Sequence, residues 1–170
     1  LTPVTLELGG KNACIVDADA PLDITARRIV FGKFFNAGQS CVAVDYLLVD
    51  RRVKQALLSH ILKYTVAFYG EDASRSSDFC RIVNEQHFDR LLGLLRAGDI
   101  VIGGGSDRAS RYIAPTVIDG ITGSEAIMED EIFGPLLPII AYDDLSEAIE
   151  FVNSRPSGLA LYFFSRNKAH

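Results

Sequence analysis

Cys41 and Glu7 are the residues best suited to chemistry in this chain of 170 residues, and both lie beside glycines. Cys41 ends the segment GQSC directly after an expected helix, which places its thiol at a cleft rather than in the core. Glu7 stands between two leucines and just before Gly9, where partial desolvation would raise the pKa of its carboxyl group. Cys41 therefore suggests a nucleophile, although a free cysteine is more often a small buried hydrophobe. We assign that structural role to Cys14 and Cys80.

Strands and helices are expected to alternate along the chain, and these elements must position the two residues. Short apolar runs predict strands at residues 4–8, 12–17, 46–49, 99–103, 112–118, 136–142 and 159–164. Apolar residues at helical spacing predict helices at residues 21–35, 51–69 and 84–97, and a last one that Asp144 and Glu147 cap and that ends at residue 153. Pro138 would place its strand at an edge of the sheet or delay its start. This order predicts an α/β fold with a doubly wound, mostly parallel sheet and helices on both faces.

The net charge and the cysteine content of the chain argue against several classes of function. The formal net charge of -5 argues against nucleic-acid binding, which needs a concentrated basic face. The cysteines and histidines show no ligand spacing, so we expect neither a metal site nor a disulfide framework. Unpaired cysteines favour a reducing, cytoplasmic location. No apolar run is long enough to span a bilayer, while membrane association of a longer parent chain is left open.

Three motifs that follow one another along the chain contain Glu7, Cys41 and Glu131. The segment ELGGK at residues 7–11 is followed by Cys41, 34 positions (41 minus 7) after its glutamate, and then by EIFGP at residues 131–135. Residues 158–165 continue the same order. Over residues 6–165, these motifs resemble the aldehyde dehydrogenase superfamily. Details at residues 69–72, 111–116 and 159–162 are most similar to its class 3 branch, which handles fatty and aromatic aldehydes.

The resemblance implies NAD(P)-dependent oxidation of aldehydes to carboxylic acids. Cys41 would attack the aldehyde as a thiolate, the thiohemiacetal would give its hydride to the nicotinamide, and water would cleave the resulting thioester. Glu7 would deprotonate that water, and the backbone N–H of Cys41 would donate to the developing oxyanion. Glu131 would hold the nicotinamide ribose, Phe133 would pack beside the nicotinamide, and Gly9 would be a further cofactor-binding position. Without the motifs, the acidic residues around Glu131 would be read as a solvated turn and Phe133 as a core ring.

The resemblance also implies that residues 1–170 are one Rossmann-like catalytic domain, truncated at both ends. The chain begins on Leu1 rather than Met, and residues 165–170 look like the first turn of a helix cut in mid-element. The cofactor-binding domain would lie upstream of Leu1, so NAD or NADP would be bound mainly outside these residues. We expect these residues alone to be inactive. The full-length parent is expected to be a homodimer or another homo-oligomer that acts on a small aldehyde.

Two other functions are compatible with the sequence. A nicotinamide-independent cysteine hydrolase or acyltransferase would need a histidine base beside Cys41, and no histidine is close to it in sequence. A non-catalytic scaffold would keep the fold and lose the chemistry. The joint presence of Cys41, Glu7 and Glu131 argues against that third function.

Overall fold

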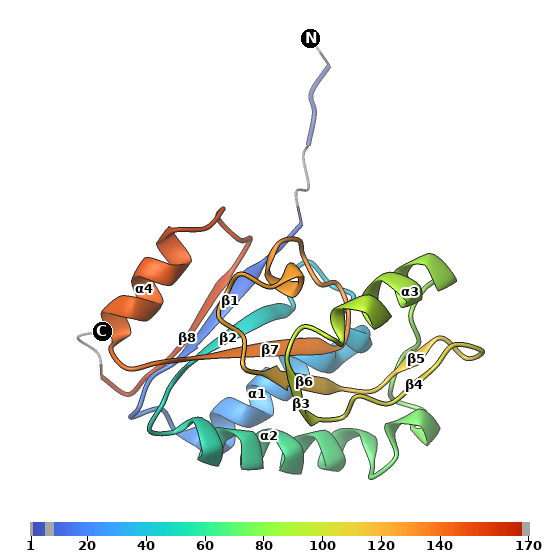
Figure 1. Ribbon diagram of the computed structural model, residues 1–170, viewed down its shortest axis with the longest axis horizontal. Helices are drawn as coiled ribbons and strands as arrows, with labels where there is room; N and C mark the ends of the chain where they lie inside the picture. The colour runs from blue at the N-terminus through green and yellow to red at the C-terminus, as the bar shows by residue number, and fades with distance from the viewer. Residues whose placement is uncertain (1, 6–8, 168–170) are drawn as a thin grey trace.

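A six-stranded mixed sheet forms the centre of the part of the chain that the computed structural model describes, residues 2–5 and 9–167. The strand order is β3-β6-β7-β2-β1-β8, in which β3 is antiparallel to β6 and the other neighbours are parallel (Figure 1). The strands are β1 (Asn12–Val16), β2 (Val44–Asp50), β3 (Asp99–Ile102), β6 (Thr116–Asp119), β7 (Leu136–Tyr142) and β8 (Leu161–Phe164), and β4 (Ser106–Asp107) pairs with β5 (Tyr112–Ile113) in a separate hairpin. Every residue of β1 and β2 is buried, as expected for inner strands that are covered on both faces.

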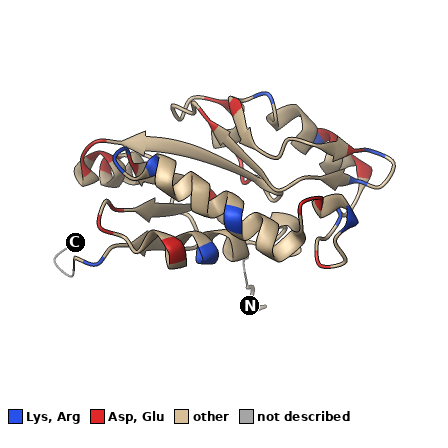
Figure 2. Ribbon diagram, turned by 90° about the horizontal axis from the view of Figure 1, so that it is seen from below, with Lys and Arg blue, Asp and Glu red and all other residues tan. Residues whose placement is uncertain are grey.

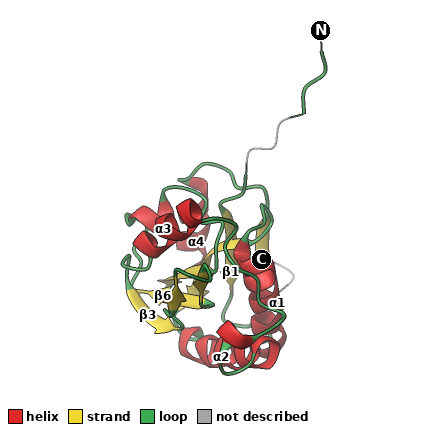
Figure 3. Cartoon of the chain, turned by 90° about the vertical axis from the view of Figure 1, so that its right-hand side faces the viewer, coloured by secondary structure: helices red, strands yellow, loops and turns green. Residues whose placement is uncertain are grey.

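Helices cover both faces of this sheet (Figure 3). They are α1 (Leu22–Phe34) and α2 (Lys54–Tyr69) on one face, and α3 (Glu85–Leu94) and α4 (Leu145–Asn153) on the other. Three short 3₁₀ turns connect the described elements: η1 (Phe35–Gly38), η2 (Ala73–Arg75) and η3 (Ala126–Met128). The chain winds from β1 through α1 to β2, and later returns from β7 through α4 to β8 on the other side of β1. The prediction of a doubly wound, mostly parallel α/β sheet is therefore confirmed.

Local sequence signals explain where the helices begin and end. The side chain of Asn84 accepts the N–H of His87 at 2.9 Å and caps α3. Asp144 accepts the N–H of Ser146 at 2.9 Å and caps α4, as predicted. Glu147 accepts the N–H of Asp143 at 3.0 Å, one residue before the usual capping-box donor.

Three predicted elements differ from the structure. Pro138 is not in an edge strand, because β7 lies between β6 and β2. Pro138 stands where the pairing of β7 with β6 ends and its pairing with β2 begins. The backbone N–H that proline lacks is therefore not needed at this position. The strand predicted at 112–118 is divided into β5 and β6. Residues 4 and 5 are not in a strand, and the rest of the strand predicted at 4–8 lies outside the described residues.

Acidic and basic residues are interspersed on helices and loops rather than gathered on one face in the view of Figure 2. That the chain does not bind nucleic acid stays a prediction from its net charge of -5. Within the described residues, each helix is too short or too polar to cross a membrane.

Candidate active site

Cys41 lies in an exposed turn between η1 and β2, as predicted for a reactive thiol. Side chains from β1 and β8 hold the backbone of this turn through hydrogen bonds. The amide of Asn12 donates to the carbonyl oxygens of Cys41 at 2.8 Å and Ala43 at 2.9 Å, and the Tyr162 hydroxyl donates to the carbonyl of Val42 at 2.6 Å. These bonds fix the backbone while the thiol stays accessible.

The other two cysteines differ from each other. Cys14 in β1 is fully buried, which raises the pKa of its thiol far above the usual value and keeps it uncharged. This outcome confirms its structural role. The assignment of Cys80 was wrong, because this residue is exposed in the loop that follows Phe79, whose ring occupies the core position instead.

Gly9 and Gly10 lie between the Cys41 turn and Glu131. A Cβ atom on Gly10 would stand 2.0 Å from the carbonyl oxygen of Cys41, so only glycine allows this approach. A Cβ atom on Gly9 would stand 2.6 Å from Oε2 of Glu131. The ELGGK, GQSC and EIFGP motifs therefore meet at these two glycines. Glu7 lies outside the described residues.

Glu131 presents an unusual carboxylate. Its Oε1 is buried and has no hydrogen-bond partner among the described residues. Burial raises the pKa of its carboxyl group, while the N–H of Gly10 and the positive charges of Lys33 and Lys11 oppose the rise. A buried acceptor without a donor is costly, and a ligand hydroxyl would satisfy it. This oxygen fits the ribose-holding role that the motifs imply. The alternative of a solvated acidic turn agrees with Glu129 and Asp130, which are exposed, but not with this buried oxygen.

Phe133 follows two residues later and is exposed rather than buried. The residue is 37% exposed, which contradicts the core-ring alternative. Its φ of 47° lies in the left-handed region, which bulky residues rarely adopt. Strain of this kind persists only where neighbours enforce it. Here the guanidinium of Arg90 donates to the carbonyl of Ile132, and Asp45 accepts the N–H of Ile132 at 2.9 Å.

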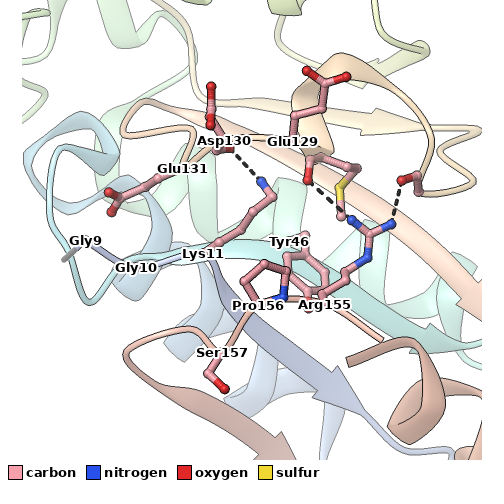
Figure 4. Close-up of a pocket in the computed structure, with 12 residues that line it drawn as sticks. Gly9, Gly10, Lys11, Tyr46, Glu129, Asp130, Glu131, Arg155, Pro156 and Ser157 are labelled. Carbon is pink, nitrogen blue, oxygen red and sulfur yellow. Dashed lines mark hydrogen bonds between the residues drawn. The ribbon is translucent and has the colours of Figure 1, made fainter. Parts of the chain in front are cut away.

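A frame of charged residues, not predicted from the sequence, holds the loop that carries Glu131. The ammonium of Lys11 pairs with Asp45 at 2.6 Å and donates to the carbonyl of Ile127 at 3.0 Å. It also donates to the carbonyl of Asp130 at 2.8 Å (Figure 4). Only 3% of the Asp45 side chain is exposed. Arg155 holds the start of the same loop through carbonyls, including that of Met128 at 3.3 Å. A charged residue in the buried strand β2 was the available signal for Asp45.

A cavity of about 340 Å³ opens between these groups. Gly9, Lys11, Glu131 and Arg155 are among its walls, and the cationic ends of Lys11 and Arg155 are turned to loop carbonyls (Figure 4). Cys41 is not among its described lining residues; the Cys41 turn is joined to it through Gly10.

We predict that Gly38→Ala destabilises the protein by about 3 kcal/mol, because the added Cβ would lie 2.2 Å from the carbonyl oxygen of Gly134 at a φ of +73°. Gly70→Ala is the matched control: its φ is +81°, but an added Cβ meets nothing within 4 Å. Only the backbone strain of about 1 kcal/mol is expected there. Denaturant unfolding of the full-length protein measures both, and equal losses would refute the close contact between the Cys41 and Glu131 segments.

Comparison with known proteins shows which family this chain belongs to. The family model described as "Aldehyde dehydrogenase family" matches residues 1–170. The dimeric NADP-preferring aldehyde dehydrogenase of Canis lupus familiaris is 50% identical over 98% of this chain, and the 4,4'-diaponeurosporen-aldehyde dehydrogenase of Staphylococcus aureus is 50% identical over 99%. The chain spans 37% of the length of each. The solved substrate-bound state of Staphylococcus aureus AldH matches with a TM-score of 0.96 and 49% identity, over 98% of this chain and 37% of that one. The chain therefore belongs to the aldehyde dehydrogenase family and resembles its class 3 branch, as the motifs predicted.

Proposed function

We propose that the full-length protein oxidises aldehydes to carboxylic acids with NAD or NADP, through a thioester on Cys41. Residues 1–170 supply the catalytic domain of that longer chain. The observation that carries this proposal is the meeting of the Cys41 turn and the Glu131 carboxylate at Gly9 and Gly10. Family membership over the whole chain supports it.

Cys41 acts as the nucleophile. Its thiolate adds to the aldehyde carbon, and its backbone N–H donates to the oxygen that becomes negative. Asn12 and Tyr162 prevent the turn from moving by holding its carbonyls. After oxidation, Glu7 takes a proton from the water that opens the thioester; this assignment rests on its place in the ELGGK motif.

The residues present fit a nicotinamide cofactor. Glu131 offers a buried acceptor for ribose hydroxyls, Gly9 leaves room beside that carboxylate, and Phe133 presents an exposed ring. When bound, the cofactor supplies the hydride acceptor. Most of its contacts are proposed to come from residues outside this chain. The relative from Canis lupus familiaris is named dimeric and NADP-preferring, and we propose a homodimer or another homo-oligomer here as well.

Glu131→Gln tests the cofactor role. We expect kcat/KM for NAD(P) to fall by about tenfold or more in the full-length protein, because the amide accepts hydroxyl donors less strongly than a carboxylate. Absorbance of the reduced cofactor, with a medium-chain or aromatic aldehyde as substrate, measures this. Glu71→Gln is the control, since Glu71 is exposed in the loop after α2 and does not line this cavity. If both variants behave alike, Glu131 has no special role.

A cysteine hydrolase is less well supported. Its histidine base would have to reach Cys41, yet His60 lies 3.4 Å from Asp23 on the side of α1 and α2, and His87 is exposed on α3. His170 lies outside the described residues. No group of three or more His, Cys, Asp or Glu gathers as metal ligands among the described residues. A cytoplasmic location stays a prediction from the unpaired cysteines.

A further inference from the structure

Lys33 is a fully buried lysine that no hydrogen bond explains. It lies on α1 with 0% of its surface exposed, and its ammonium nitrogen has no hydrogen-bond partner among the described residues. Burial lowers the pKa of this amine from its usual 10.5 to about 8. Lysine is almost never buried in this way unless a charge partner compensates. Because this lowered pKa still lies above 7, Lys33 is mostly cationic at neutral pH.

The charges that face Lys33 come from three other segments. They are Asp45 on β2, Lys11 just before β1, and Glu131 in the loop after η3. Asp45 exerts the larger attraction, but both of its oxygens are already engaged, one by Lys11 and the other by the N–H of Ile132. Glu131 is the carboxylate that still has a buried oxygen without a partner.

Packing brings the end of α1 to the loop that carries Glu131. A Cβ atom on Gly38 would lie 2.2 Å from the carbonyl oxygen of Gly134 and 3.0 Å from that of Lys33. The turn that contains Lys33 thus abuts the EIFGP segment. The Lys33 ammonium and the Glu131 carboxylate each have a buried atom without a hydrogen-bond partner among the described residues, and their charges act on each other.

We propose that Lys33 is a positioning residue for the cofactor site, whose buried positive charge keeps Glu131 in the ionised form that accepts hydrogen bonds from the ribose hydroxyls. This inference rests on the proposed role of Glu131. Removing the charge would raise the pKa of Glu131 further, because burial would then be opposed only by Gly10 and Lys11 while Asp45 adds to it. The protonated carboxyl group binds the hydroxyls less well.

The test is the affinity of the full-length protein for NAD(P), measured by calorimetry from pH 6 to 9 without aldehyde. Lys33→Met should move the acid limb of the affinity profile to higher pH, so that binding at the acid end of this range is several-fold weaker than in the unmodified protein. At pH 9 the variant should match the unmodified protein, since Lys33 is itself largely uncharged above pH 8. The midpoint of thermal unfolding should rise, because a desolvated charge is replaced by an apolar side chain.

Two further variants separate the outcomes. In a Glu131→Gln background, Lys33→Met should leave the affinity profile unchanged. Lys63→Met, which removes an exposed lysine paired with Asp23, should leave the profile of the unmodified protein unchanged. If Glu131→Gln weakens binding but Lys33→Met does not move the acid limb, the inference about Lys33 is wrong and the proposed function stands. If Glu131→Gln itself has no effect, the role of Glu131 and the inference both fail. Should Lys33→Met not fold, Lys33→Gln carries the same expectation.

Discussion

Replacing Cys41 by alanine in the full-length protein is expected to lower kcat for aldehyde oxidation by about 10⁴-fold or more. The reason is covalent: without the sulfur there is no thiohemiacetal from which the substrate can be oxidised. Folding should be unaffected, because Cys41 is exposed and its turn is held through backbone carbonyls. Initial rates with a medium-chain aldehyde and saturating cofactor measure the loss.

Cys80→Ala is the matched control for this experiment. Cys80 is also an exposed thiol, but it lies in the loop before α3 and outside the contacts that join the Cys41 turn to Glu131. Its removal should change kcat by less than about twofold. A protein that keeps its activity without Cys41, or loses it without Cys80, would contradict the assignment of the nucleophile.

Glu7→Gln is expected to slow hydrolysis of the thioester by about 10²- to 10³-fold while slowing its formation much less. The amide keeps the shape of the side chain but cannot take a proton from water. Rapid mixing of the full-length variant with aldehyde and NAD(P) should therefore show a burst of reduced cofactor, followed by a slow steady rate. Glu7→Asp, which keeps a carboxylate, should recover part of the steady rate. An unchanged steady rate in Glu7→Gln would remove Glu7 from the mechanism.

Local signals were enough to predict much of this fold. The apolar runs of β1 and β2 and the capping residues Asn84 and Asp144 act within a few positions of the chain, and the structure agrees with them. The prediction that Pro138 lies in an edge strand was wrong. Proline has no backbone N–H, but this is harmless at the point where β7 changes its pairing partner from β6 to β2. The position of that point depends on the register of three strands, which local sequence does not show.

The parts of the site that were missed depend on contacts between distant residues. Asn12 looks like an ordinary strand residue until its amide is seen on the carbonyl of Cys41, 29 positions away. Lys11 and Asp45 are 34 positions apart, and the carbonyls that Lys11 binds are more distant still. Lys33 would be read as a basic residue near the end of a helix, since its burial comes from the tertiary packing of α1.

Trapping the intermediate tests the central claim most directly. The full-length Glu7→Gln variant would be mixed with octanal and NAD(P), quenched during the burst, and mapped by peptide mass spectrometry. The account predicts an octanoyl group on the sulfur of Cys41, in an amount that matches the burst of reduced cofactor, and none on Cys14 or Cys80. A burst without an acyl group on Cys41, or an acyl group on another residue, would contradict it.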